Sequence, residues 1–290
     1  MFDKKMKGLI SILLIGLMIF TFTACQQQET ANQDTEAEGE KQKAEVVKTK
    51  LDEIKANGKI VLGTAADYPP YEFHKVINGK DEIVGFDIEI AKQIAKDLGV
   101  ELEIKDMKFD GLLAALVADD IDFILAGMVP KPERKKSVDF SIPYYAAEQK
   151  MLVRADVADK IKTIEDLKGF KIGVQKSTVQ EDIAKEKIQP NVEGVEVKGL
   201  SKITDLVLEL KNGKIDGIVL VEPVAMAYGE QNEDLAVPEI SFGQEAGVAV
   251  AVNKGNAKLL DAINKSLQKM LDEGKIDKFI TDATLLSEQE

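Results

Sequence analysis

"DGLLAALVADDIDFILAGMV", residues 110–129, combines two patterns. It begins with apolar side chains at helical spacing and ends in an apolar run that is typical of a buried strand. Before it come a β-branched strand pattern over residues 58–66, a helical pattern over residues 85–100 that stops at Gly99, and a strand pattern over residues 101–107. Strands that alternate with helices in this way predict a mainly parallel α/β sheet.

A shorter echo of that stretch lies further along the chain. "LLAALVADDID" (112–122) and "LVLELKNGKID" (206–216) each join an apolar helix, a turn and an Ile-Asp pair to a buried strand. The echo suggests two lobes built on similar plans. Around it, residues 163–187 predict a short helix, a strand and a second helix, residues 247–256 predict a strand, and residues 257–280 predict an amphipathic helix pair.

The N-terminal segment looks like a bacterial lipoprotein signal. Three lysines precede an apolar run that ends at Cys25, the only cysteine, and "FTAC" is similar to a lipobox, with Phe22 where leucine is usual. We therefore expect residues 1–24 to be a signal peptide and Cys25 to carry the lipid. The alternative is a transmembrane anchor, and the placement of Cys25 argues against it. Residues 25–49 are polar and predict a disordered tether.

The composition restricts the chemistry of the folded part. With Cys25 lipidated, no thiol remains for a disulfide, a nucleophile or a Cys-type zinc site, and His74 is the only histidine. A net charge of −13 disfavours nucleic acid or an anionic membrane surface as the direct partner. We expect no metal, no cofactor and no nucleic acid to bind.

Six segments closely resemble the bacterial extracellular solute-binding proteins of family 3, the polar amino-acid type, which are lipoprotein receptors of ABC importers. The resemblance covers nearly all of residues 50–285, in the right order and with the right gaps. The segments are "GTAADYPPYEF", "GFDIEIAKQIAKDLG", "FDGLLAALVADDIDFILAGM", "PERKKSVDFSIPYY", "TIEDLKGFKIGVQKSTVQE" and "EGKIDKFI".

The resemblance implies an α/β, two-lobed, periplasmic-binding-protein-like (Venus flytrap) fold with two hinge crossings. The crossings would fall near Glu148–Val153 and near Gly243–Val248. Lobe one would comprise residues 51–147 plus 247–286, and lobe two residues 150–243. A cleft between lobes is where small ligands commonly bind, and hinge closure around them is a known class of motion.

The implied function is capture of an amino acid or a related small carboxylate and its delivery to an ABC permease and its ATPase. The protein would perform no chemistry, since closure reflects a higher affinity of the closed state for the ligand. We expect a monomer, held by its lipid on the extracellular face of the membrane. The Lys- and Ile-rich signal favours a Gram-positive host, and the ligand stays unidentified.

Arg134 is the residue that the resemblance assigns to the ligand carboxylate, because a guanidinium matches a carboxylate bidentately. Spacing alone would favour a solvated surface arginine beside two lysines. By the same resemblance, the turn before a helix of lobe two adds backbone N–H groups and a hydroxyl, aromatic rings flank the ligand side chain, and strand-end backbone bonds the ligand. These further residues are Thr178 and Val179 beside Ser177, then Tyr68, Phe109, Gly127, Val129 and, at the cleft mouth, Asp67.

Two positions depart from the family pattern at the amino group of the ligand. Val129 stands where serine or threonine is usual, and Val221 stands where an acid is usual, with the acid one place later at Glu222. Because successive strand side chains point to opposite faces, Glu222 would face away unless a bulge turned it inward. Ala65, where relatives with cationic ligands often have an acid, weakens the case for lysine or arginine.

Two other functions remain open. The same fold hosts lyases such as cyclohexadienyl dehydratases, for which Glu222 is the candidate acid. An extracellular sensor domain is the third possibility, although such proteins usually continue into a membrane helix and a signalling domain.

Overall fold

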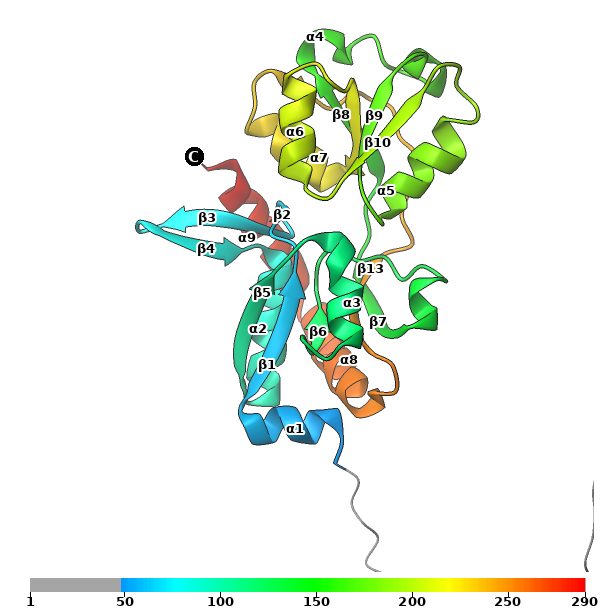
Figure 1. Cartoon of the computed structure of the whole chain (residues 1–290). Helices are drawn as coiled ribbons and strands as arrows, with labels where there is room; N and C mark the ends of the chain where they lie inside the picture. Colours follow the sequence, from blue (N-terminus) through cyan, green and yellow to red (C-terminus); the bar gives the residue numbers. More distant parts are fainter. Residues whose placement is uncertain (1–47, 290) are drawn as a thin grey trace, which may run out of the picture. The chain divides into compact units, whose positions relative to one another are not determined.

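The computed structural model describes residues 48–289, coloured in Figure 1. The predicted signal peptide, Cys25 and most of the predicted tether lie outside the described residues. Thr49, the end of the predicted tether, caps helix α1 (Lys50–Asn57) and forms a capping box with Asp52. None of the described helices is both long and apolar enough to cross a bilayer.

The first sheet forms the core of lobe one. Its strand order is β5-β1-β6-β13-β7, with β1 parallel to β5 and β6, and β13 antiparallel to β6 and β7. Side chains of α1, α2, α8 and α9 share a core with one face of the sheet, and η1 and α3 cover the other. The bounds are β1 Lys59–Thr64, β5 Glu101–Asp106, β6 Phe123–Ile124, β7 Val138–Tyr145, β13 Val248–Asn253, α2 Phe86–Leu98, η1 Phe109–Gly111, α3 Leu112–Val117, η2 Arg134–Lys136, α8 Ala257–Asp272 and α9 Lys275–Glu288.

The second sheet forms the core of lobe two, in the order β10-β9-β11-β8-β12. Here β9 is parallel to β10 and β11, and β8 is antiparallel to β11 and β12. Apolar side chains of α6 and α7 pack on one face, and those of the π-helix η4 on the other. The bounds are β8 Gln149–Arg154, α4 Ala155–Ala158, η3 Ile164–Leu167, β9 Lys171–Gln175, α5 Val179–Asp182, η4 Ile183–Ile188, β10 Glu196–Leu200, α6 Ile203–Lys211, β11 Gly217–Val221, α7 Glu222–Glu230 and β12 Leu235–Ala236.

The two sheets follow the same plan. Each places three parallel strands beside two antiparallel ones, as the strand orders show. The echoed segments 112–122 and 206–216 lead into β6 and β11, and each of these strands is third in its sheet. The two-lobed α/β fold expected from the sequence is thus confirmed, and the echo marks equivalent units of the two lobes.

The chain passes between the lobes twice. It leaves β7 of lobe one and enters β8 of lobe two at Gln149, and it leaves β12 and returns to lobe one at β13. An antiparallel bridge joins Glu148 to Gln244, so the two crossings run side by side. The first crossing is earlier than the expected 148–153, because Gln149–Arg154 already pairs within the second sheet. The exact lobe boundaries stay a prediction.

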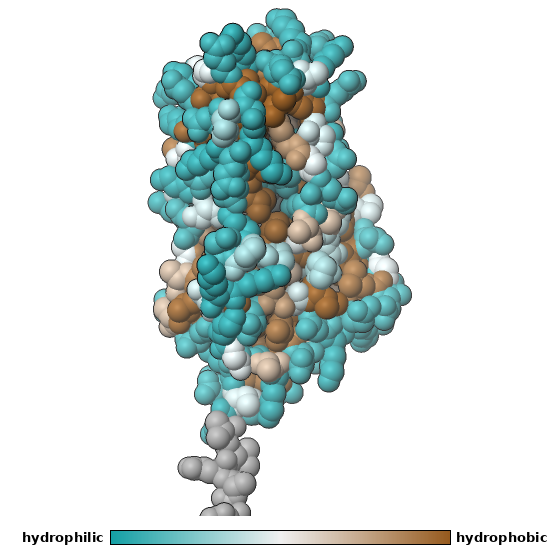
Figure 2. Space-filling view, turned by 90° about the vertical axis from the view of Figure 1, so that its right-hand side faces the viewer, coloured by the Kyte–Doolittle hydropathy of each residue, from teal (hydrophilic) through white to brown (hydrophobic). Residues whose placement is uncertain are grey.

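A small antiparallel sheet of β2 (Asp67–Tyr68), β3 (Glu72–Ile77) and β4 (Lys80–Val84) extends from lobe one. Figure 1 shows β3 and β4 as a hairpin. On the face shown in Figure 2, hydrophilic side chains cover most of the surface and hydrophobic groups show between them. The hairpin begins at Glu72 and ends at Val84, both buried, and its residues near the turn between β3 and β4 are more exposed.

Two segments differ from their sequence patterns. The strand expected to run to Val129 ends at Ile124, and Gly127 has a φ of 53°. The Gly127 N–H donates to the Asp87 carboxylate instead of to a strand, which leaves this backbone free to line a cavity. The C-terminal tail continues α9 to Glu288, because Ala283 and the neighbouring helical turns pack against the core.

Gly85, before α2, allows a close backbone approach that a side chain would prevent. Its φ is 131°, and an added Cβ would lie 2.1 Å from the carbonyl oxygen of Tyr71. We expect Gly85→Ala to lower the free energy of unfolding by about 3 kcal/mol or more, measured by urea denaturation. Gly99→Ala is the matched control, since Gly99 also has positive φ but open space around it, and should cost about 1 kcal/mol. Equal losses in the two variants would contradict the steric explanation.

Candidate functional site

A cavity between the lobes brings the expected site residues together. Its volume is about 20 Å³, room for about one water molecule, and it is lined by residues of both lobes. Eight of the nine residues expected to contact the ligand line it; Glu222 does not. The lining residues are Ala65, Asp67, Tyr68, Glu72, Phe109, Ala126, Gly127, Val129, Arg134, Gln175, Thr178, Val179 and Gln180.

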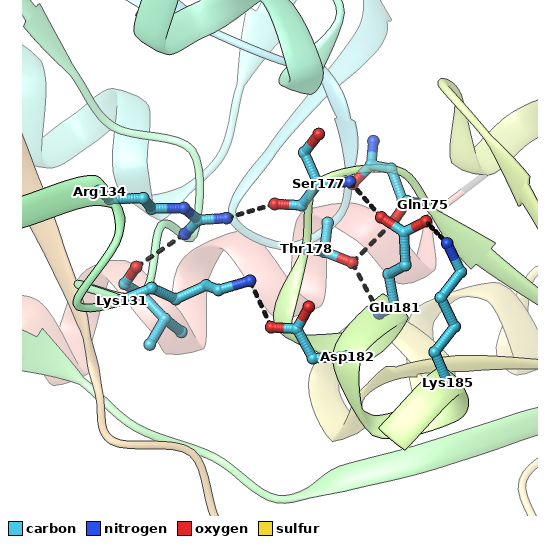
Figure 3. Close-up of polar contacts among 9 residues, drawn as sticks. Lys131, Arg134, Gln175, Ser177, Thr178, Glu181, Asp182 and Lys185 are labelled. Carbon is cyan, nitrogen blue, oxygen red and sulfur yellow. Dashed lines mark hydrogen bonds and ion pairs between the residues drawn. The ribbon is translucent and has the colours of Figure 1, made fainter. Parts of the chain in front are cut away.

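Arg134 reaches from lobe one across this cavity. Its side chain is buried, with one nitrogen, Nη1, donating to the Val129 carbonyl at 2.7 Å and the other, Nη2, donating to the Ser177 carbonyl at 2.6 Å (Figure 3). Its guanidinium carbon lies 5.3 Å from the centre of the Phe109 ring. Burial lowers the pKa of Arg134 to about 10, so it remains positively charged at neutral pH. Arg134 is therefore not the solvated surface arginine of the alternative interpretation.

The turn of lobe two that Arg134 contacts is held in an unusual conformation. Ser177 has a φ of 65°, a region that favours glycine, and its N–H donates to the Glu181 carboxylate at 2.7 Å. Thr178 accepts from the Glu181 N–H and donates to the Gln175 carbonyl at 2.7 Å, so its hydroxyl caps α5 (Figure 3). The turn thus presents its carbonyl to Arg134 while internal bonds fix its shape.

A second contact across the cleft lies beside Arg134. Lys131 of lobe one pairs with Asp182 of lobe two (Figure 3). The Lys131 side chain is 20% exposed and that of Asp182 39%, so water weakens this pair. Lys131 adds an ion pair between the lobes near the cavity.

Asp67 lines the cavity and also joins the lobes. Its carboxylate accepts from the Ile203 N–H at 2.8 Å, and its carbonyl accepts from the Tyr228 hydroxyl at 2.9 Å. Burial raises the pKa of Asp67 to about 6. Because Ile203 and Tyr228 belong to lobe two, the carboxylate of Asp67 is already engaged in holding the lobes together.

The two aromatic residues expected at the site both line the cavity. Phe109 packs on the guanidinium of Arg134, as described above. The Tyr68 ring lies 5.2 Å from that of Tyr71, and its hydroxyl is 3.5 Å from Nε2 of Gln180. Gln180 also donates to Gln149 at 2.9 Å, so an amide network from lobe two reaches Tyr68.

Glu72 is the main site residue that the sequence analysis missed. It is only 1% exposed, lines the cavity, and neither carboxyl oxygen has a hydrogen-bond partner among the described residues. Burial, followed by repulsion from Asp87, raises the pKa of Glu72 well above its usual value. The signal was an acid between Tyr71 and Phe73 in the quoted segment "GTAADYPPYEF". A single acid near a strand end usually faces water, so the pattern alone did not single it out.

Glu222 is not part of the cavity. Val221 ends β11 fully buried, and Glu222 starts α7 with its side chain exposed. The pairing of β11 with β8 is regular and ends at Val221, so Glu222 lies beyond the strand, at the start of the helix. The expectation that Glu222 contacts the ligand is corrected accordingly. Val129 lines the cavity with an apolar side chain, and its carbonyl accepts from Arg134, whereas Val221 is buried and does not line the cavity.

The chain is similar in sequence to a known family and to proteins that bind amino acids. The family model of bacterial extracellular solute-binding proteins, family 3, matches residues 60–282. The arginine-binding extracellular protein ArtP of Bacillus subtilis is 36% identical over 276 residues, which cover 94% of this chain and 96% of that protein. The L-cystine-binding protein TcyJ of Escherichia coli K12 is 37% identical over 229 residues, covering 78% of this chain and 82% of that protein.

A solved structure of an amino-acid-binding protein is also similar to this chain. The amino acid ABC transporter substrate-binding protein AbpA of Streptococcus pneumoniae, bound to L-arginine, is 38% identical to this chain. It superposes with a TM-score of 0.78 over 82% of this chain and 100% of the other. The two-lobed fold, the cavity between the lobes and the family match all agree, and the chain belongs to the bacterial extracellular solute-binding proteins of family 3.

Proposed function

We propose that this protein captures an amino acid with a cationic side chain between its lobes and delivers it to the permease and ATPase of an ABC importer. It would work outside the cytoplasm, held to the membrane by a lipid on Cys25. The relatives described above, amino-acid-binding proteins, support the transport role. The lipid anchor rests on the N-terminal sequence pattern.

The observation that carries the proposal is the buried guanidinium of Arg134 in the cavity. Its hydrogen-bond partners among the described residues are two neutral carbonyls, and no described carboxylate pairs with it. A buried positive charge in this state favours an anionic ligand group, and a guanidinium binds a carboxylate through two parallel bonds. We assign the α-carboxylate of the ligand to Arg134.

Glu72 supports the cationic class. A ligand cation would give its unpartnered carboxyl group the partner that the described residues do not provide. The α-ammonium group lies two bonds from the carboxylate and stays near Arg134, whereas a long side chain reaches further into the cavity. Two similar proteins, ArtP and AbpA, are named or solved with arginine. Glu72 therefore counts more strongly for a cationic ligand than the absence of an acid at Ala65 counts against it.

A binding panel tests the proposal with the full chain. Thermal shift and calorimetry would compare L-arginine with L-lysine, L-citrulline, L-glutamine and L-cystine. A true ligand at 100 times its dissociation constant should add about 2.7 kcal/mol of stability. A shift with neutral amino acids alone would contradict the cationic class, and no shift with any amino acid would contradict amino-acid capture.

The lyase alternative loses the residue that suggested it. Glu222, its candidate acid, is exposed and does not line the cavity. Incubation of the protein with prephenate or arogenate, with a search for an aromatic product, separates the two functions.

A further inference from the structure

Two buried acids meet at one wall of the cavity. Asp87 of α2 is fully buried, its N–H donates to the carbonyl of Tyr71, next to Glu72, at 3.0 Å, and its charge acts on the carboxyl group of Glu72. One Asp87 oxygen, Oδ2, accepts from the Gly127 N–H at 3.0 Å and from the Tyr144 hydroxyl at 2.8 Å. The other, Oδ1, has no partner among the described residues.

Among the described residues, no positively charged side chain pairs directly with either carboxyl group, although Arg134 lines the same cavity as Glu72. No lysine, arginine or histidine of residues 48–289 forms a hydrogen bond or an ion pair with either group. The charged groups that act on Glu72 are acids on neighbouring elements: Asp87 on α2, Asp67 on β2 and Asp106 at the end of β5, the last within 3.4 Å of His74. Other titratable groups near the pair are the hydroxyls of Tyr68, of Tyr71, which has no described partner, and of Tyr144.

Two neighbouring buried carboxyl groups cannot both be ionised without a large cost, so such a pair normally holds one proton. Asp87 accepts the two donors and is the better placed of the two to carry the negative charge. Glu72, without a donor, is the better placed to hold the proton and donate it to Asp87. Burial raises the pKa of Asp87 to about 6 and that of Glu72 further above its usual value, in line with this order.

We propose that Glu72 and Asp87 together hold one proton in the free protein and release it to solvent when the cationic side chain of the ligand enters. This inference rests on the proposed function. Before binding, two carboxyl groups and one proton carry a charge of −1. After binding, two carboxylates and one ligand cation again carry −1, and the proton has passed to the buffer. Asp87 then helps Glu72 to determine specificity, because the two carboxyl groups exchange their shared proton for the cationic side chain of the ligand.

Exchange of this kind has a defined pH dependence. If binding releases one proton, affinity for L-arginine rises about tenfold for each pH unit in the range where the free pair is protonated. L-Citrulline has nearly the same shape but a neutral side chain, so its affinity should stay nearly constant. L-Citrulline is also the control for the titration of Asp67 and Glu245. Burial raises the pKa values of these residues to about 6 and about 7, and their titration should affect the binding of both ligands equally.

The experiment is calorimetry of the full chain with L-arginine and L-citrulline at several pH values from about pH 6 to about pH 8. Buffers of different ionisation enthalpy give the number of protons released. We expect roughly one proton for L-arginine at neutral pH, and roughly none for L-citrulline. Arginine binding without proton release would overturn this inference and leave the proposed function intact, whereas a protein that binds no amino acid would overturn both.

Two variants test the role of Asp87. Asp87→Asn removes the repulsion that keeps the proton on Glu72, so proton release should fall below half of the wild-type value. If that variant does not fold, Tyr144→Phe removes one donor to Asp87 and should move the arginine affinity curve to higher pH. Glu82→Gln, an exposed acid of the same hairpin, is the matched control and should release as many protons as the wild type. Wild-type behaviour of both Asp87→Asn and Tyr144→Phe would overturn the inference.

Discussion

Replacing Arg134 with alanine is expected to raise the dissociation constant for the amino-acid ligand by about 100-fold to 1,000-fold, or about 3–4 kcal/mol. The variant loses the fork for the ligand carboxylate and leaves that carboxylate without a counter-charge in a buried site. It also removes the hydrogen bond to Ser177, one of the contacts that join the lobes. Calorimetry measures the constant, and the ligand-induced thermal shift should disappear.

Two further variants show whether the guanidinium fork is responsible. Arg134→Lys keeps the charge but not the planar fork and should still lose about tenfold or more in affinity. Lys135→Ala removes an exposed neighbouring charge and should bind like the wild type. Comparable losses in the Arg134 and Lys135 variants would mean that general surface charge, and not the fork, attracts the ligand.

Replacing Glu72 with glutamine is expected to weaken L-arginine binding by about 100-fold while L-citrulline binding changes by less than about threefold. The variant removes a buried negative charge that a ligand cation neutralises, a contribution of about 2–3 kcal/mol for a charged hydrogen bond. Equal losses for arginine and citrulline would place the α-ammonium group, instead of the side chain, at Glu72.

The same variant should also stabilise the free protein. The pKa of Glu72 is raised by folding, so its contribution to stability is present at low pH and is lost as pH rises toward the folded-state pKa. Urea denaturation should therefore show Glu72→Gln gaining on the wild type from about pH 5 to about pH 8. Glu82→Gln, an exposed acid nearby, should show no such trend.

Much of the fold could be predicted because its signals are local. Apolar residues at helical spacing located α2, α6 and α8, and the echoed segments marked equivalent strands in two sheets. The role of Arg134 was predicted from the family resemblance, since spacing alone favoured a surface residue. The short β6 could not be predicted, because what ends it is a hydrogen bond from Gly127 to Asp87, a contact between residues 40 positions apart.

The site was predicted less completely for a similar reason. Glu72 is buried in a cavity lined by residues of both lobes, and no pattern within β3 reveals this. Glu222 begins helix α7 beyond the end of β11, whereas the sequence pattern treated it as part of the strand, and it remained a candidate because the ligand ammonium needed an acid. Long-range packing decides which acids face a cavity, and a single sequence records that packing only indirectly.

The order of strands also has a bearing on biosynthesis. The strands of lobe two are continuous in sequence, whereas an interior place in the sheet of lobe one, between β6 and β7, is filled by β13 near the end of the chain. A ribosome therefore releases every strand of lobe two before lobe one can complete its sheet. Until β13 is made, the half-built lobe one keeps two open strand edges, and β13 closes both of them.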